Sequence, residues 1–173
     1  KAGDGAWYSY SRNLKIFADR VREAGGEIIF CTPTARRFFN DDHKTIRNTH
    51  GDYPEAMKTV ARRENIPVID LTRMSTQFYE TLGEEGSKKS LVHYPANTFP
   101  GQDKALADNT HFNPFGAWEI AKMIVMGLKQ INSPLVDSLQ ADWQDFDPSH
   151  PDDPDTFVWH MSSGSNITKP DGN

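Results

Sequence analysis

Apolar residues recur at helical spacing near the start of the chain. Positions three and four residues apart are apolar and the positions between them are mostly charged, which predicts a helix over residues 7–24. Gly25 and Gly26 end this helix, and residues 27–32 then form a short apolar and β-branched run that Pro33 closes. That run predicts a buried strand. The apolar positions of the helix are Leu14, Phe17, Ala18 and Val21.

The same order of elements follows further along the chain. A polar loop over residues 33–51 leads to a second helix, with Asp52 as its expected N-cap and Pro54 in its first turn. Residues 66–71 are again mostly apolar and predict a second buried strand. A third helix is expected over about residues 72–82, capped by the threonine at its start.

The second half of the chain is less regular. Residues 83–112 are long and contain several prolines and glycines, so we expect a mostly irregular loop that is functional or mobile. Asn113 and Pro114 then open the most regular helix of the sequence, because the first turn of a helix tolerates proline. The chain becomes acidic and proline-rich after this helix. We expect a folded part over residues 1–131 and, over 132–173, an extension that wraps the surface or serves as a linker.

Helices that alternate with buried strands predict an α/β fold with parallel strands. Two predicted strands cannot cover the apolar faces of four helices, and parallel sheets usually have about five strands. The chain also opens directly in a helix and begins with Lys1 rather than with Met. We therefore expect the C-terminal part of a larger α/β domain, processed or excised from a longer chain.

Composition narrows the class of protein. The 19 basic and 24 acidic residues give a net charge of −5, which argues against a general nucleic-acid binder. No apolar run approaches the roughly 20 residues that span a bilayer, so we expect no membrane anchor. The single cysteine, Cys31, excludes an internal disulfide and a cysteine-based zinc cluster. Its place at a strand end predicts a small buried side chain.

The sharpest chemical signal is Asp108-Asn-Thr-His111, directly before the last helix. A carboxylate three residues before a histidine, in a loop that enters a helix, can lie beside the imidazole. The aspartate would then accept a hydrogen bond from one ring nitrogen and stabilise the imidazolium, while the other nitrogen takes a proton from a nucleophile. The alternative is an aspartate and a histidine in a solvated turn, because the motif is short.

The surroundings of this motif resemble a known family. Asp-x-Thr-His-Phe, followed by Pro-x-Gly-Ala and an apolar helix, resembles the final sequence block of the SGNH (GDSL-type) hydrolases. Further blocks resemble the rhamnogalacturonan acetylesterase branch in order and spacing, at residues 32–37, 51–57, 68–71 and 79–83. The resemblance covers roughly residues 8–131. It implies a three-layer α/β/α flavodoxin-like fold, of which this chain is the C-terminal part, with His111 as general base and Asp108 as its orienting acid.

The reaction that this resemblance implies is removal of acetyl groups from pectin-type polysaccharide through an acyl-enzyme. The family's Gly-Asp-Ser nucleophile block, oxyanion-hole glycine and Gly-x-Asn-Asp block belong before the point where this sequence begins. A circular permutation that uses Ser163 or Ser165 is an alternative, although no β-branched run precedes these serines. We expect only the acid–base half of a site, to be completed by a missing N-terminal segment of the same domain.

Some other residues are candidate substrate contacts. Arg36 and Arg37 are candidates to bind the carboxylate of an acidic sugar such as galacturonate, because a guanidinium fork fits a carboxylate. Pairing with an acid of their own loop is the alternative. Trp118 is a candidate for stacking on a sugar, and His93-Tyr94 for bordering a cleft. Helix packing and an ordinary solvated loop are the alternatives for these residues.

We therefore favour a secreted or periplasmic SGNH-type carbohydrate acetylesterase that acts on acetylated polysaccharide or oligosaccharide without a cofactor. No metal is expected, because His43 and His50 lack a metal-ligand spacing and the acidic tail lacks the EF-hand spacing for calcium. Two other hypotheses stay open. One is a non-catalytic carbohydrate-binding relative, and the other is a metal-dependent hydrolase that uses Asp108, His111 and a loop histidine.

Overall fold

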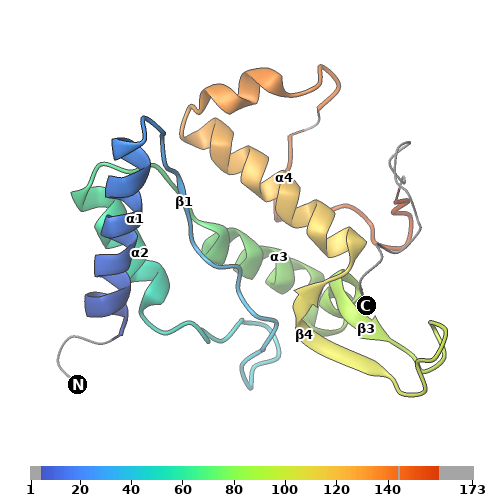
Figure 1. Ribbon diagram of the computed structural model, residues 1–173. Helices are drawn as coiled ribbons and strands as arrows, with labels where there is room; N and C mark the ends of the chain where they lie inside the picture. The colour runs from blue at the N-terminus through green and yellow to red at the C-terminus, as the bar shows by residue number, and fades with distance from the viewer. Residues whose placement is uncertain (1–4, 144, 160–173) are drawn as a thin grey trace.

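The computed structural model describes residues 5–143 and 145–159, which form helices and two small sheets (Figure 1). A π-helical turn at Ala6–Tyr10 leads into the first helix, and 3₁₀ turns occur at Ser87–Ser90 and Pro134–Ser138. The helices are α1 (Ser11–Glu23), α2 (Tyr53–Arg63), α3 (Leu71–Gly86) and α4 (Pro114–Gln130). The strands are β1 (Phe30–Cys31), β2 (Val68–Ile69), β3 (Leu91–Tyr94) and β4 (Leu106–Phe112).

β1 and β2 pair as parallel strands between two layers of helices. Phe30 lies opposite Val68, and Cys31 lies opposite Ile69. Alternate residues of a strand point to opposite faces of a sheet. Phe30 accordingly packs with α1 and α2, whereas Ile69 packs with α3 and α4, on the other side of the sheet in Figure 1. The predicted order of helices and parallel strands is confirmed.

The parallel sheet is smaller than predicted. Its strands pair over two residues each, within the longer segments 27–32 and 66–71. The prediction that Cys31 is buried is wrong, because this side chain is exposed. Cys31 and Ile69 share one face of the sheet, and α4 packs on that face at Ile69. The contact is close, because a Cβ on Gly127 would lie only 2.4 Å from Cγ2 of Ile69. The described residues thus cover Ile69 of β2, whereas the side chain of Cys31, its partner on β1, is exposed.

α3 begins earlier than predicted, with Asp70 rather than Thr72 as its N-cap. The Asp70 carboxylate accepts a hydrogen bond from the N–H of Arg73 at 3.1 Å. Thr72 instead donates its N–H to Oγ1 of Thr32 at 2.9 Å and its hydroxyl to the backbone oxygen of Pro33. These bonds join the carboxyl ends of β1 and β2, which is the edge where open α/β sheets bind their ligands.

Residues 83–112 are not the mostly irregular loop that the sequence predicted. α3 continues to Gly86, with a break at Gly83, whose φ of 72° lies in the left-handed region. β3 and β4 then pair as an antiparallel hairpin. β4 lacks the alternation of apolar and polar residues that marks a half-buried strand, because Asp108–Thr110 are consecutive polar residues.

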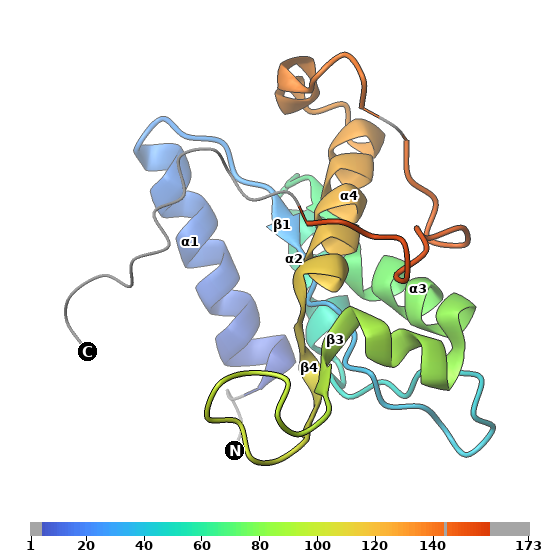
Figure 2. The same ribbon diagram turned by 90° about the vertical axis from the view of Figure 1, so that its right-hand side faces the viewer.

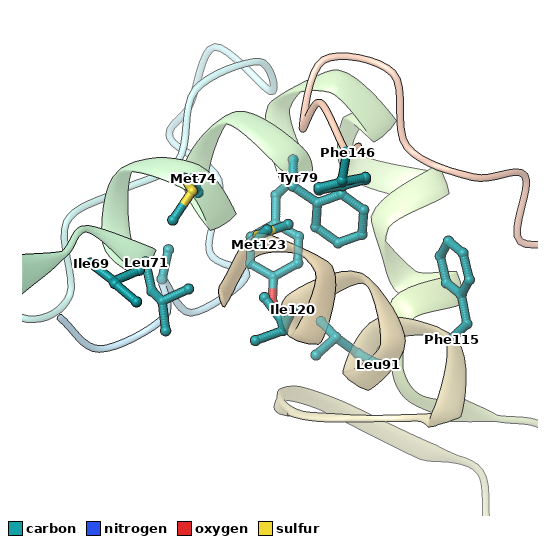
Figure 3. Close-up of a cluster of buried hydrophobic side chains, with 11 residues drawn as sticks. Ile69, Leu71, Met74, Tyr79, Leu91, Phe115, Ile120, Met123 and Phe146 are labelled. Atoms are coloured by element: carbon teal, nitrogen blue, oxygen red, sulfur yellow. The ribbon is translucent and has the colours of Figure 1, made fainter. Parts of the chain in front are cut away.

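The larger hydrophobic core lies between α3, α4 and the hairpin. Figure 3 shows Tyr79 of α3 and Met123 of α4 in this core, together with Leu91 at the start of β3. Each of these side chains is at most 1% exposed, and burial of one large apolar side chain stabilises a fold by roughly 1.5–3 kcal/mol. The core therefore fixes both the hairpin, which carries His111, and α4, the helix that follows it.

The acidic segment after α4 runs along that helix (Figure 2). Phe146 is buried in the larger core, and the ring of Phe157 lies 5.5 Å from the ring of Phe115. Asp152 forms an ion pair with Lys122 of α4 at 2.6 Å. Residues 145–159 thus wrap the surface, one of the two arrangements expected from the sequence. No helix within the described residues is long and apolar enough to cross a membrane.

Candidate active site

Asp108 and His111 form a pair near the end of β4 rather than in a loop. Nδ1 of His111 lies 2.6 Å from Oδ2 of Asp108. The other carboxylate oxygen, Oδ1, accepts hydrogen bonds from the backbone N–H groups of Thr110 at 2.7 Å and of His111 at 3.0 Å. An aspartate that binds backbone groups two and three residues later forms an Asx-type turn. The three-residue spacing therefore lets one carboxylate hold both the backbone and the imidazole.

These contacts favour the ionised form of Asp108. The hydrogen bond from the His111 side chain, followed by those from the backbone of His111 and Thr110, lowers the pKa of Asp108 to about 2. The carboxylate is therefore ionised at neutral pH and acts only as an acceptor. Nδ1 of His111 is therefore the donor in this contact, and in a neutral imidazole the lone pair then lies on Nε2. The His111 side chain is 77% exposed, so this nitrogen is open to a reacting group.

A bulge in the hairpin displaces the pair from regular strand geometry. The register shifts between Leu91 and His93, so that residues 108–111 of β4 stand opposite Val92 alone. A bulge leaves extra residues without partners on the neighbouring strand and redirects their side chains. In a regular strand, residues three apart point to opposite faces. The bulge lets the first and last of these four residues meet.

The start of α4 fixes the chain directly after the bulge. Asn113 caps the helix by accepting the N–H of Gly116 at 2.9 Å, and its Nδ2 donates to the backbone oxygens of Lys89 at 2.6 Å and Leu91 at 3.2 Å. A Cβ on Gly116 would lie 1.9 Å from the backbone oxygen of Ser90. The asparagine and the glycine of the Asn-Pro-Phe-Gly sequence thus dock α4 against the start of the hairpin.

The two arginines predicted to bind an acidic sugar lie in different environments. Arg36 is half-buried, and its Nη1 donates to the backbone oxygen of Thr49 at 3.3 Å. Arg37 is only 5% exposed, and each nitrogen of its guanidinium donates to an acceptor within the protein. Sugar binding stays a prediction for both residues. The contacts of Arg37 favour a role inside the protein.

The loop histidines have separate partners. Nδ1 of His43 lies 2.6 Å from Oε2 of Glu84, whereas Nε2 of His50 lies 2.8 Å from the backbone oxygen of Thr34. His93 of β3 reaches across the hairpin to a side-chain oxygen of β4 at 2.9 Å. Within residues 5–143 and 145–159, no three His, Cys, Asp or Glu side chains gather as a candidate metal-binding group.

A second Asp-x-x-His motif, which the sequence reasoning did not single out, lies in the acidic segment. Nδ1 of His150 lies 3.0 Å from Oδ2 of Asp147. The pair borders a cavity of about 670 Å³ that Trp118 and Trp143 also line, with their ring centroids 6.2 Å apart. The signal for this pair is present in the sequence as the same spacing, Asp147-Pro-Ser-His150. The proposed stacking of Trp118 on a sugar stays a prediction.

Comparison with known proteins finds two sequence relatives whose names describe acetylesterases. No protein-family model matches it. It is 38% identical over 137 residues to the rhamnogalacturonan acetylesterase RhgT of Bacillus subtilis (strain 168), a match that covers 79% of this chain and 59% of RhgT. It is 33% identical over 131 residues to the probable rhamnogalacturonan acetylesterase YesY of the same strain, covering 76% of this chain and 55% of YesY. The chain spans little more than half the length of these relatives.

The fold also has a counterpart among solved structures. The crystal structure of the Bacillus subtilis protein YxiM, which has an SGNH-type fold, matches with a TM-score of 0.58 at 21% sequence identity. The match covers 72% of this chain and 32% of YxiM, and at this identity it concerns the fold alone. The predicted α/β fold of the SGNH type is therefore confirmed, as is the resemblance to the rhamnogalacturonan acetylesterases. The catalytic roles of Asp108 and His111 stay predictions.

Proposed function

We propose that this chain, a relative of rhamnogalacturonan acetylesterases with part of an SGNH-type fold, supplies His111 and Asp108 to the Ser-His-Asp site of a carbohydrate acetylesterase. The substrate is an acetylated pectin-type polysaccharide or oligosaccharide, with rhamnogalacturonan as the leading candidate. The reaction is hydrolysis of its acetyl esters. The names of the two sequence relatives support this substrate class. A secreted or periplasmic location is consistent with a polysaccharide substrate and is part of the proposal.

His111 acts as the general base in this mechanism. Its Nε2 takes the proton of the serine hydroxyl while the serine oxygen attacks the acetyl carbonyl. The imidazolium returns the proton to the sugar oxygen as the ester C–O bond breaks, and the acetyl group remains on the serine. Water then attacks the acyl-enzyme, with Nε2 again taking a proton. Acetate leaves as the serine oxygen regains that proton.

The observation that carries the proposal is the set of hydrogen bonds by which Asp108 orients the imidazole of His111. One carboxylate oxygen lies 2.6 Å from Nδ1, and the other accepts two backbone N–H groups, so the carboxylate cannot turn away from the ring. An ionised aspartate in this position selects the tautomer with a free Nε2 and stabilises the positive charge that develops on the imidazole. Both are requirements for a base that serves a serine nucleophile.

In this proposal the serine and the oxyanion-hole donors come from residues outside this sequence. The chain spans 59% of RhgT and 55% of YesY, which leaves room in a protein of that length for a further segment. Ser163 and Ser165, the serines considered for a permuted arrangement, lie outside the residues that the structure describes. A full-length sequence that encodes a Gly-Asp-Ser block would supply the missing nucleophile.

Replacement of the base in the full-length protein tests the proposal. We expect His111→Ala to lower kcat for acetate release from acetylated rhamnogalacturonan by on the order of 10⁴-fold or more, as for other members of a triad. His150→Ala is the matched control, because it removes a histidine from a motif with the same spacing. We expect this control to keep the wild-type rate.

Two results would contradict the proposal. Full activity of His111→Ala would show that His111 is not the base. A wild-type protein that binds the polysaccharide but releases no acetate would instead support the non-catalytic carbohydrate-binding alternative. Loss of activity in both histidine variants would point to damage of the fold, which the melting temperature of each variant measures separately.

A further inference from the structure

Arg37 lies inside the protein although its guanidinium is charged. Its residue exposure is 5%, and a buried charge is costly unless its polar atoms are paired. Nε donates to Oγ of Ser87 at 2.8 Å, Nη2 donates to the backbone oxygen of Glu84, and Nη1 donates to Oδ1 of Asn109 at 2.8 Å. The guanidinium also lies 5.6 Å from the ring centre of Phe39. Arg37 therefore joins the loop after β1 to the end of α3 and to β4.

Asn109, within the bulge of β4, is held by its backbone and by its side chain. Its backbone oxygen accepts the N–H of Arg37 at 3.0 Å, and its Oδ1 accepts Nη1 of the same residue. A guanidinium only donates, so the amide atom facing it is the oxygen. Nε2 of His93 lies 2.9 Å from the same oxygen and is therefore a donor as well. Asn109 follows Asp108 directly and precedes His111 by two residues.

We propose that Arg37 is a positioning residue for the Asp108–His111 pair, because its two hydrogen bonds to Asn109 hold the bulge in which the carboxylate meets Nδ1 of His111. The kinetic consequences of this inference rest on the proposed esterase function, but its structural consequences do not. The inference gives Arg37 a role distinct from that of a sugar ligand.

The bulge needs support from outside itself. Residues 108–111 stand opposite Val92 alone, so the neighbouring strand does not pair with each of them. The bonds of Asp108 to Thr110 and His111 lie within the bulge and move with it. Arg37 is attached to the end of α3 and the turn after it, which border the larger core. It can therefore fix the bulge relative to the rest of the fold.

Arg37→Met in the full-length protein tests this role, with Arg47→Met as the matched control. Arg47 lies 5.6 Å from the ring centre of Phe38, as Arg37 does from Phe39, but it is exposed, and within the described residues it contacts Phe38 through its side chain and its backbone. We expect Arg37→Met to lower kcat for acetate release by on the order of 10²-fold with little change in KM, because a displacement near 1 Å can cost this much. Arg47→Met should keep both constants.

A readout that is independent of activity separates positioning from general stability. Long-range ¹H–¹⁵N correlation spectra report which imidazole nitrogen carries the proton, and His111→Ala identifies the signals of His111. With the imidazole neutral, we expect the Nδ1–H tautomer in the wild type and in Arg47→Met. We expect a mixture that includes the Nε2–H tautomer in Arg37→Met, because Asp108 no longer faces the ring in a fixed way.

Asn109→Leu provides a second route if Arg37→Met does not fold. It removes the side-chain acceptor at the other end of the contact and leaves the backbone bond between Asn109 and Arg37 in place. We expect a partial shift of the His111 tautomer and a smaller loss of kcat than in Arg37→Met. Wild-type spectra of His111 in both folded variants would overturn the inference.

The outcomes distinguish this inference from the proposed function. If His111→Ala keeps full activity while Arg37→Met changes the tautomer of His111, the positioning role stands and the esterase mechanism fails. If His111→Ala loses activity while Arg37→Met keeps both the tautomer and kcat, the esterase mechanism stands and the positioning role fails. A large rise in KM with unchanged kcat in Arg37→Met would instead support Arg37 as a substrate contact.

Discussion

The two Asp-x-x-His motifs of this chain have the same spacing and nearly the same local geometry. In each motif the second carboxylate oxygen faces Nδ1 of the histidine, at 2.6 Å in Asp108–His111 and at 3.0 Å in Asp147–His150. In each, the first carboxylate oxygen accepts a backbone N–H from two residues later. Both histidines are largely exposed. The pairing of aspartate with histidine is thus a local property of the spacing.

The motifs differ in what surrounds them. Asp108–His111 lies in a strand bulge that Arg37 holds through the backbone and the side chain of Asn109, beyond the carboxyl end of β1. Asp147–His150 lies in the acidic segment, where Gln77 of α3 donates to the hydroxyl of Ser149. A pair formed by spacing alone becomes a candidate catalytic pair only where the fold fixes its position and direction. Three predictions test this difference between the motifs.

The largest difference between the two motifs is expected in kcat when each aspartate is replaced by asparagine. Asp108→Asn should lower kcat for acetate release by about 10⁴-fold, because an amide does not select the tautomer with a free Nε2. Asp147→Asn should keep the wild-type rate. Initial rates of acetate release in the full-length protein at saturating substrate measure both effects. Equal losses in the two variants would show that the surroundings do not distinguish the motifs.

A second difference concerns the docking of α4 beside the first pair. Gly116→Ala would place a Cβ 1.9 Å from the backbone oxygen of Ser90, so we expect it to destabilise the fold by about 3 kcal/mol through overpacking. Denaturant unfolding measures this change. In the folded fraction, spectra of His111 should change while those of His150 stay as in the wild type. Gly86→Ala is the control, because its Cβ would meet only Cβ of Leu82, at 3.6 Å.

The smallest difference is expected in the acid dependence of stability. The His111 side chain and backbone N–H groups lower the pKa of Asp108 from 3.8 to about 2. The ionised carboxylate therefore contributes fully to the stability of the fold at pH values above its pKa in the unfolded state. This contribution is lost as the pH falls from about 4 to about 2. The difference in unfolding free energy between the wild type and Asp108→Asn should therefore shrink over that range. Denaturant unfolding at a series of pH values measures it.

Asp147 provides the comparison for the acid experiment. Backbone hydrogen bonding from Ser149, and then the His150 side chain, lower the pKa of Asp147. Asp147→Asn should change the acid dependence in the same direction as Asp108→Asn. The change should be smaller, because Asp108 has two backbone donors and the shorter contact to its histidine. An Asp108→Asn difference that stays constant down to pH 2 would contradict an Asp108 carboxylate that is stabilised in its ionised form.

Several parts of the fold followed from local patterns. The helices over residues 53–63 and 114–130 have apolar stripes at helical spacing and N-terminal prolines, and they begin where the sequence predicted. The positions of the two parallel strands also followed from their apolar runs, although their paired portions are shorter than predicted and only one residue of each is buried. The β3–β4 hairpin did not follow, because its second strand is polar where it carries the candidate site.

The candidate site likewise has features that follow from local sequence and features that do not. The spacing of Asp108 and His111 predicted their contact, because residues three apart bond through the turn between them. The position of Arg37 inside the protein was not predictable from its sequence neighbourhood, since its partner Asn109 is 72 residues away. The exposure of Cys31 was not predictable from local sequence either. It depends on where α4 packs, and α4 packs against Ile69 of β2.

Local sequence patterns suffice to predict most of the helices, the positions of the two parallel strands and the contact of Asp108 with His111, because these depend on residues a few positions apart. Local patterns do not show which of the two similar motifs lies in a strand bulge, or that the charged Arg37 lies inside the protein beside that bulge. Those features depend on contacts between distant segments. Their free energy comes from burial and from hydrogen bonds that form only when the segments meet.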